Sequence, residues 1–470
     1  MILWFEWFRC VQQLRPACSR HRTFLWMTLA LAGLCIRNDL AGVTSLVRVL
    51  GLRGRCYRCF LNLFHSSGLK QAVLESCWTQ AVVKLFTPFR LEGRLVFIAD
   101  GLKVAKEGLK MPAVKKLHQS SSNNSKPSYI FGHSLQALGL LVSGPLGHLC
   151  CVPLCSPIHE GVVFSNRDKR TLLDKLALLF LGVVGGIDAP GAILVADAYY
   201  ASGKIIKPLL QRGYHLISRL RSNAVAYYRP EVPAKRGRGR PPTYGQKVRL
   251  NTLWETACEH FCDAPSPVYG ETHTTLRYYT IDLLWRPVGQ LVRFVLVEHP
   301  LRGRIMLMST DLTLSALQII TGYGYRFKIE VAFKQALHTL GTYAYHFWMR
   351  MMSPRPQRSG NQHLHHKSSD YRDQVRRKLA VYQRYIQLGC IAQGLLQYLA
   401  LYFRQSVWAA FKSWLRTMKT AQPPSEAVVA QALRDALPEF LLGAPDDHNL
   451  KKFLLENIDF DRCPPLRLAA

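Results

Sequence analysis

The stretch from Thr321 to Gly341 reads TGYGYRFKIEVAFKQALHTLG. Its spacing predicts a helix on which Tyr323, Arg326 and Glu330 share one face, because they stand at positions i, i+3 and i+7. A neighbouring face of this helix is apolar and is predicted to pack against a core. It consists of Phe327, Val331 and Leu337. A phenol, a guanidinium and a carboxylate aligned in this way suit a metal-dependent phosphate site. The alternative is an ordinary amphipathic helix with a solvated Arg–Glu pair.

Short apolar runs elsewhere in the chain end at an aspartate. The runs LVFIAD and AILVAD end at Asp100 and Asp197. We expect each run to be a buried strand that delivers its acid at the carboxyl end. A third run, IMLMSTD, leads directly into LTLSALQII, so Thr310 or Asp311 is predicted to be a helix N-cap and not a metal ligand.

Two strand-end aspartates combined with the block Tyr323-x2-Arg326-x3-Glu330 resemble the DDE transposases of bacterial insertion sequences. The resemblance covers roughly residues 90–350 and implies a ribonuclease-H-like core. It implies that Asp100, Asp197 and Glu330 are the catalytic residues and the metal ligands. The metal would be two Mg²⁺ ions about 3.5–4 Å apart, with Mn²⁺ able to substitute. The implied reaction is cleavage at the ends of a mobile element and strand transfer into target DNA.

The resemblance also assigns DNA contacts beside the acids. Tyr323 and Arg326 would position a phosphate near the cut. The chain departs from the family's pattern at Leu337, where a Lys or Arg is common. Lys334, one turn after the glutamate, is predicted to take over that phosphate contact.

A lysine-rich segment follows the first aspartate and reads GLKVAKEGLKMPAVKKLHQSSSNNSKPS over residues 101–128. Six lysines stand there against one glutamate, together with Gly, Pro and a Ser/Asn run. This composition predicts a long surface loop, which in a compact domain is usually functional. Lys103 and Lys106 are its predicted DNA contacts.

Residues 40–66 hold a candidate helix-turn-helix, in which two helical patterns flank a Gly-containing turn. Arg53, Arg55 and Arg58 would face DNA. A plain helical hairpin with solvated arginines is the alternative. A second candidate reads Lys235-Arg-Gly-Arg-Gly-Arg-Pro-Pro. Its Arg238 and Arg240 match the core of an AT-hook, and the alternative is a flexible basic loop that touches phosphates.

The overall charge favours a polyanionic partner. There are 61 Lys and Arg against 30 Asp and Glu, which gives a net charge of +31 and a pI near 9.9. Double-stranded DNA is the predicted partner and an anionic membrane surface is the competing one. The most apolar segment, residues 24–36, is shorter than the ~20 residues that a spanning helix needs, so no membrane association is predicted.

Cysteine usage favours a reducing compartment. The thirteen cysteines are an odd number and are scattered along the chain, as in a reducing compartment. Together with the resemblance to transposases of bacterial insertion sequences, this implies a cytoplasmic protein associated with the nucleoid. Cys56 and Cys59 form a Cys-x-x-Cys pair without a second pair at zinc-module spacing. Packed thiols are therefore predicted, and structural zinc is the alternative.

The predicted fold class is an α/β ribonuclease-H-like catalytic core with a β-rich insertion, flanked by helical N-terminal and C-terminal regions. The insertion includes paired strands over Arg277–Leu284 and Gln290–Glu298. The predicted domains are a helical DNA-binding region (1–90), the first part of the core (91–220), the basic insertion (221–303), the second part of the core (304–352), and a linker with a helical C-terminal region (353–470). The predicted function is a DNA transposase that works as a homodimer on DNA. The alternative is a catalytically inactive, transposase-derived DNA-binding protein.

Replacing Arg238 and Arg240 with Ala tests the basic insertion. If both contact phosphates, the log–log salt slope of DNA binding falls by about 2. If they enter a minor groove, the loss is also larger on A·T-rich than on G·C-rich DNA. Binding measured across a salt series on both DNAs checks this, and an unchanged slope would remove the two arginines from the interface.

Overall fold

The computed structural model describes residues 1–119, 127–231, 240–268, 270–271 and 273–462. Its internal contacts divide the chain into two compact units. The sheet unit consists of Pro88–Asp100 and Arg170–Ile329, and the helical unit of Met1–Thr87, Gly101–Lys169 and Glu330–Ala470. The segments predicted as the two parts of the core, 91–220 and 304–352, therefore each contribute to both units.

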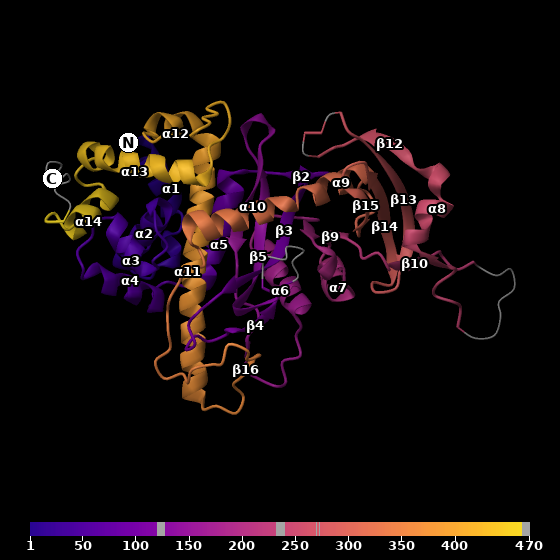
Figure 1. Cartoon of the computed structure of the whole chain (residues 1–470), viewed down its shortest axis with the longest axis horizontal. Coiled ribbons are helices and arrows are strands. Elements are labelled where there is room, and N and C mark those ends of the chain that lie inside the picture. Colours follow the sequence, from indigo (N-terminus) through magenta and orange to yellow (C-terminus); the bar gives the residue numbers. More distant parts are fainter. Residues whose placement is uncertain (120–126, 232–239, 269, 272, 463–470) are drawn as a thin grey trace. The chain divides into compact units, whose positions relative to one another are not determined.

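The sheet unit is built on one mixed sheet with short helices (Figure 1). Its strands lie in the order β3–β8–β9–β15–β14–β13–β10–β11, with β2 beside β3 and β12 beside β13. The strands are β2 (Arg90–Leu91), β3 (Arg94–Ala105, in this unit as far as Asp100), β8 (Ile193–Ala196), β9 (His215–Arg219), β10 (Val225–Tyr227), β11 (Lys247–Arg249), β12 (Cys262–Pro265), β13 (Thr275–Trp285), β14 (Gln290–His299) and β15 (Gly303–Ser309). The helices are α6 (Leu172–Val184), α7 (Gly203–Leu210), α8 (Leu253–Thr256) and α9 (Ala316–Gly324).

Three neighbouring strands of this sheet run parallel. β3 pairs with β8 and β8 pairs with β9, and α7 forms the crossover between the last two. The residues of β8 are fully buried, as expected for a parallel strand covered on both faces. The prediction that LVFIAD and AILVAD form buried strands is confirmed, and β8 ends directly before Asp197 as expected. β3 differs from the prediction, because it continues past Asp100 to Ala105.

The β-rich segment continues the same sheet. The predicted pairing of Arg277–Leu284 with Gln290–Glu298 is confirmed, because β13 and β14 pair antiparallel from Arg277 opposite Glu298 to Trp285 opposite Gln290. β14 then pairs with β15, and β15 pairs with β9. The segment predicted as an insertion is therefore joined to the parallel strands through backbone hydrogen bonds.

The helical unit contains most of the helices and a second group of strands. Its helices are α1 (Ile2–Gln12), α2 (His21–Ile36), α3 (Val43–Val49), α4 (Cys56–His65), α5 (Gln71–Leu85), α11 (Ser369–Tyr402), α12 (Arg404–Ala410), α13 (Glu426–Gly443) and α14 (Asn449–Asn457). Its strands are β4 (Lys115–His118), β5 (Tyr129–Ser143), β6 (Leu149–Cys155), β7 (Val162–Val163) and β16 (Gln362–His363). The strand β1 (Thr87–Pro88) and the helix α10 (Phe327–Gln335) span the boundaries between units.

The helical unit is organised around α11, the long helix in Figure 1, against which α2, α4, α5 and β6 pack. Buried glutamines tie this helix to the strands, because Gln387 and Gln397 donate to the carbonyls of Leu154 and Cys151 on β6. These bonds explain why residues 101–169 group with the C-terminal helices. Within the described residues, no single helix is long and apolar enough to cross a bilayer; α11 and α12 meet that test only together, by length and composition, across a 100° bend.

The lysine-rich segment after Asp100 differs from the predicted surface loop. β4 lies within it and pairs antiparallel with β5. Met111, Ala113 and Val114 are almost fully buried. The apolar residues between the lysines therefore fold into the core, and residues 120–126 of the predicted loop lie outside the described residues.

The start of α9 also differs from prediction. Ser315 is the N-cap and forms a capping box with Gln318, so neither Thr310 nor Asp311 caps the helix. Asp311 is buried and its carboxylate pairs with the guanidinium of Arg94, while its second oxygen accepts from the backbone N–H of Thr313. The third aspartate thus serves as the buried partner of an arginine from β3.

Replacing Asp311 with Ala should destabilise the sheet unit by about 3 kcal/mol, because it leaves the Arg94 guanidinium without its buried counter-ion. Asp263→Ala is the control, since that carboxylate is exposed and faces Arg277 at 3.7 Å; a change within about 0.5 kcal/mol is expected. Urea unfolding of both variants measures the difference, and equal effects would contradict the buried-pair account.

Candidate active site

Asp100 and Asp197 stand side by side in the sheet unit. The printed register of β3 against β8 pairs Phe97 with Leu194 and Ile98 with Val195. Carried on by two residues, it places Asp100 opposite Asp197. Neighbouring strands lie about 4.8 Å apart, so the two residues lie close together at the point where β8 ends. Both residues are partly exposed, whereas the residues before them are buried.

Arg326 neutralises the first of these acids. Its Nη1 donates to Asp100 Oδ2 at 2.8 Å, and the two side chains are 17% and 22% exposed. This partial burial makes the ion pair stronger than a solvated surface pair. The guanidinium contacts Asp100 and is mostly buried, which differs from the solvated arginine that the alternative of an ordinary amphipathic helix expected.

Tyr323 faces the second acid. Its phenol donates to Asp197 Oδ1 at 3.5 Å. The pKa of Tyr323 is raised to about 12, mainly by burial; Arg326 lowers it and the Asp197 carboxylate raises it. The phenol consequently stays protonated at physiological pH and serves as a hydrogen-bond donor.

Ser218 is a site residue that the sequence patterns did not indicate. It lies on β9, and its hydroxyl donates to the backbone carbonyl of Asp197 at 3.0 Å. The same carbonyl accepts from the N–H of Tyr200. These two bonds hold the main chain as it leaves β8. A serine within a mostly apolar strand gives little signal in the sequence, because its partner is 21 positions away.

The helix that carries Tyr323 and Arg326 is interrupted, contrary to the prediction of one continuous helix. α9 ends at Gly324 and α10 begins at Phe327. Between them the backbone N–H groups bond three residues back, from Arg326 to Tyr323 and from Ile329 to Arg326. Because of this tighter turn, the i, i+3, i+7 positions do not lie on one regular α-helix.

Two glycines explain why the helix packs closely and then stops. A Cβ atom at Gly324 would lie 2.4 Å from a methyl group of Val268, and one at Gly322 would lie 3.0 Å from Leu91. Glycine is also a poor helix former. The GYG sequence therefore allows α9 to sit against the sheet unit and favours the break before Arg326.

Glu330 stands on α10 and is exposed. The boundary between the units falls directly before it, so its predicted convergence with Asp100 and Asp197 stays a prediction. Within the described residues, no three His, Cys, Asp or Glu side chains form a group that could hold a metal ion. The two adjacent aspartates offer the oxygen donors that hard divalent cations take, and the set needs a further ligand to be complete.

The predicted DNA contacts of the lysine-rich segment have different surroundings. Lys103 is exposed, and its Nζ donates to the carbonyl of His118 at 2.5 Å. Lys106 is only 8% exposed; its Nζ bonds to the carbonyls of Tyr343 and Tyr345. Burial lowers the pKa of Lys106 to about 7. The predicted DNA contact of Lys106 is therefore wrong, because its side-chain nitrogen is buried and hydrogen-bonded to two backbone carbonyls.

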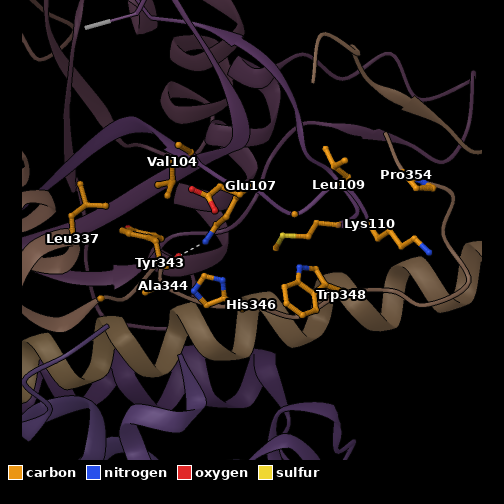
Figure 2. Close-up of a pocket in the computed structure, with 15 residues that line it drawn as sticks. Val104, Glu107, Leu109, Lys110, Leu337, Tyr343, Ala344, His346, Trp348 and Pro354 are labelled. Atoms are coloured by element: carbon orange, nitrogen blue, oxygen red, sulfur yellow. Dashed lines mark hydrogen bonds between the residues drawn. The ribbon is translucent and has the colours of Figure 1, made fainter. Parts of the chain in front are cut away.

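Lys106 belongs to the wall of a cavity of about 780 Å³ inside the helical unit. Figure 2 shows Leu337, His346 and Trp348 among the side chains around it. Leu337, at the position where a basic residue was expected from the resemblance, thus lines an apolar cavity. Lys334 is exposed on α10, as a phosphate contact requires.

The other predicted DNA contacts lie on the surface. Arg53, Arg55 and Arg58 are exposed, and the helices α3 and α4 flank them as predicted. The turn between these helices is held by α14, since the N–H of Arg53 donates to the carbonyl of Asn457 at 2.9 Å. Arg240 is exposed, whereas Arg238 lies outside the described residues.

Three comparisons with known proteins bear on this site. Residues 13–278 match the family described as DDE superfamily endonuclease, a range that includes both aspartates and ends before Glu330. No curated protein matches the chain. Among solved structures, the cryo-EM structure of the piggyBac transposase synaptic complex with hairpin DNA is similar at 13% identity and a TM-score of 0.36, over 96% of this chain and 82% of that one.

Replacing Arg326 with Met should increase the thermal stabilisation that Mg²⁺ confers, because a cation at Asp100 no longer competes with the guanidinium. A tenfold gain in affinity would add about 1.4 kcal/mol and raise the melting temperature by about 3–5 °C. Scanning fluorimetry with and without Mg²⁺ measures this. The double variant Arg326→Met/Asp100→Asn is the control, in which the gain should disappear; equal Mg²⁺ shifts in wild type and Arg326→Met would contradict the competition.

Proposed function

Because the chain belongs to the DDE superfamily endonuclease family, we propose that it is a DNA transposase that cleaves the ends of a mobile element and joins them to target DNA. The observation that carries the proposal is the pair of aspartates on and directly after neighbouring parallel strands, each of which accepts from a donor in the segment 323–326. Arg326 contacts Asp100 and Tyr323 contacts Asp197. A carboxylate pair with a guanidinium and a phenol at its edge is suited to phosphoryl transfer, in which positioning and charge stabilisation dominate.

Each side chain has a role in this proposal. Asp100, Asp197 and Glu330 would hold divalent cations, Mg²⁺ in the first place. Bound there, the cations would supply Lewis-acid stabilisation and lower the pKa of a water or a DNA 3′-hydroxyl. Arg326 would pass from Asp100 to a phosphate oxygen when DNA arrives, because the phosphate offers the same bidentate acceptor geometry. Tyr323 would donate a hydrogen bond from its phenol O–H to the same phosphate.

A ribonuclease-H-like core is part of the proposal. The parallel pairs β3–β8 and β8–β9, with α7 as the connection, support it. β8 ends directly before Asp197, and Asp100 lies within β3, beside that end of β8. This arrangement follows the general rule that ligands bind at the carboxyl ends of parallel strands.

Double-stranded DNA is the proposed partner, on the evidence of the net charge of +31. Arg53, Arg55 and Arg58 stand exposed beside α4 and would contact the element end. Action as a homodimer on paired ends and a cytoplasmic, nucleoid-associated location, as in bacterial insertion sequences, complete the proposal. They rest on the resemblance given by Tyr323-x2-Arg326-x3-Glu330.

One observation favours a second candidate, a DNA-binding protein that has lost catalysis. Leu337 replaces the basic residue of the third block and faces an apolar cavity. A leucine in that setting has no means of holding phosphate. The presence of all three acids favours the enzyme, and Lys334 on the exposed side of α10 offers a replacement contact.

Asp197→Asn should abolish Mg²⁺-dependent cleavage of DNA that carries the element ends, by at least a hundredfold, because it removes one proposed cation ligand. DNA binding should be unchanged or tighter, since one negative charge near the phosphate is lost. Gel assays of cleavage and binding measure the two effects separately.

Asp188→Asn is the matched control, because Asp188 is an exposed aspartate of the same unit and should tolerate the change. Undiminished cleavage by Asp197→Asn would exclude Asp197 as a ligand. Absence of cleavage by the wild type, with DNA binding intact, would favour the second candidate.

A further inference from the structure

The loop of residues 412–421, between α12 and α13, has an unusual surface. It reads KSWLRTMKTA, and each of its residues is exposed. Trp414 is 79% exposed, Met418 46% and Leu415 37%. Single exposed apolar side chains are ordinary, but three within five residues, one of them an indole, form a patch of the kind that marks interaction sites.

The charge of this loop has one sign. Lys412, Arg416 and Lys419 interleave with the three apolar residues, and the loop contains no acid. Lys412 and Arg416 stand two positions before and after Trp414. An exposed aromatic ring between cations matches the chemistry of a surface that stacks on a base while it contacts phosphates.

Hydrogen bonds hold both ends of the loop in place, and its side chains project from an anchored backbone. The N–H of Lys412 donates to Asp435 on α13 at 2.9 Å. At the other end, Arg404 Nη1 donates to the carbonyl of Ala421 at 2.5 Å, and Trp408 Nε1 donates to the carbonyl of Gln422 at 3.4 Å. These bonds occupy main-chain groups and leave the indole and the three cations exposed to a partner.

We propose that the loop 412–421 is a DNA contact in which Trp414 stacks on an unpaired or unstacked base and Lys412, Arg416 and Lys419 bind the flanking phosphates. It rests on the proposed function for the presence of DNA, and it adds an interface apart from the aspartate site, the helices α3 and α4, and the basic insertion. Unpaired bases occur at gaps and frayed strand ends, and such a base is the ligand that an exposed indole accepts.

The test measures binding of the full chain to an intact duplex and to the same duplex with a short single-stranded gap. Trp414→Ala should weaken binding to the gapped DNA about 5- to 150-fold, the range expected for loss of one base–aromatic stack. Its affinity for the intact duplex should change less than about twofold, since no base is available for stacking. Trp414→Phe should restore most of the affinity for gapped DNA.

The charge component is tested with Lys412, Arg416 and Lys419 replaced by Gln. Three lost phosphate contacts should lower the log–log salt slope by about 2–3 on both DNAs. Two matched controls keep the result specific. Trp348→Ala removes another indole of the helical unit that is 60% exposed, and Lys84, Lys452 and Arg462 replaced by Gln remove three other exposed cations.

If the wild type binds gapped DNA and Trp414→Ala binds it equally well, the loop proposal is overturned while the proposed function stands. A wild-type chain that binds neither DNA would overturn both. Binding to phosphatidylserine vesicles that depends on Trp414, with DNA binding unaffected, would assign the loop to a membrane surface and likewise overturn it. Circular dichroism of each variant verifies folding. The Trp414 side chain is 79% exposed, so its replacement should leave the fold unchanged.

Discussion

The parallel pairing of β3 with β8 is the constraint on which the candidate site depends. It fixes the register of two strands that are far apart in the sequence, and this register carries Asp100 and Asp197 to the same edge of the sheet. Two carboxylates at that separation repel each other unless a cation lies nearby. The guanidinium of Arg326 meets this requirement on Asp100, and the phenol of Tyr323 donates to Asp197.

The two donors, Tyr323 and Arg326, lie where the helix is interrupted between α9 and α10. A regular helix through residues 321–341 would present Tyr323 and Arg326 as neighbours on one face. Tyr323 lies near the end of α9 and Arg326 lies in the tight turn that follows it, and the two side chains contact different aspartates. Glycine is required because Val268 and Leu91 approach within the space of a Cβ atom. The two glycines therefore serve both the close packing of α9 and the position of Tyr323 and Arg326 in the site.

Within the helical unit, basic residues divide into structural and accessible ones. Lys106 is buried on the carbonyls of Tyr343 and Tyr345, where desolvation lowers its pKa to about 7. Arg55 and Arg58 beside α4 and the cations of the loop 412–421 remain exposed. The net charge of +31 consequently overstates the number of cations available to a polyanion, and the exposed groups are those that define where DNA would bind.

The sequence by itself determined the local features. The runs that end at Asp100 and Asp197 are buried strands, and the alternating segments around 277–298 form a hairpin, because apolar pattern and strand length depend on neighbouring residues alone. Family motifs placed Tyr323 and Arg326 beside the aspartates, and the contacts of both agree with that placement.

Tertiary structure alone decided which charges meet. The pairing of Asp311 with Arg94, the burial of Lys106, and the bond from Ser218 to the carbonyl of Asp197 all join residues far apart in the chain. From the sequence, Asp311 is predicted to be near a helix cap and Lys106 to be exposed to solvent. Both predictions rest on what a segment prefers in isolation. Desolvation and ion pairing depend on what packs against the group, and that is set only when the sheet and the long helix have assembled.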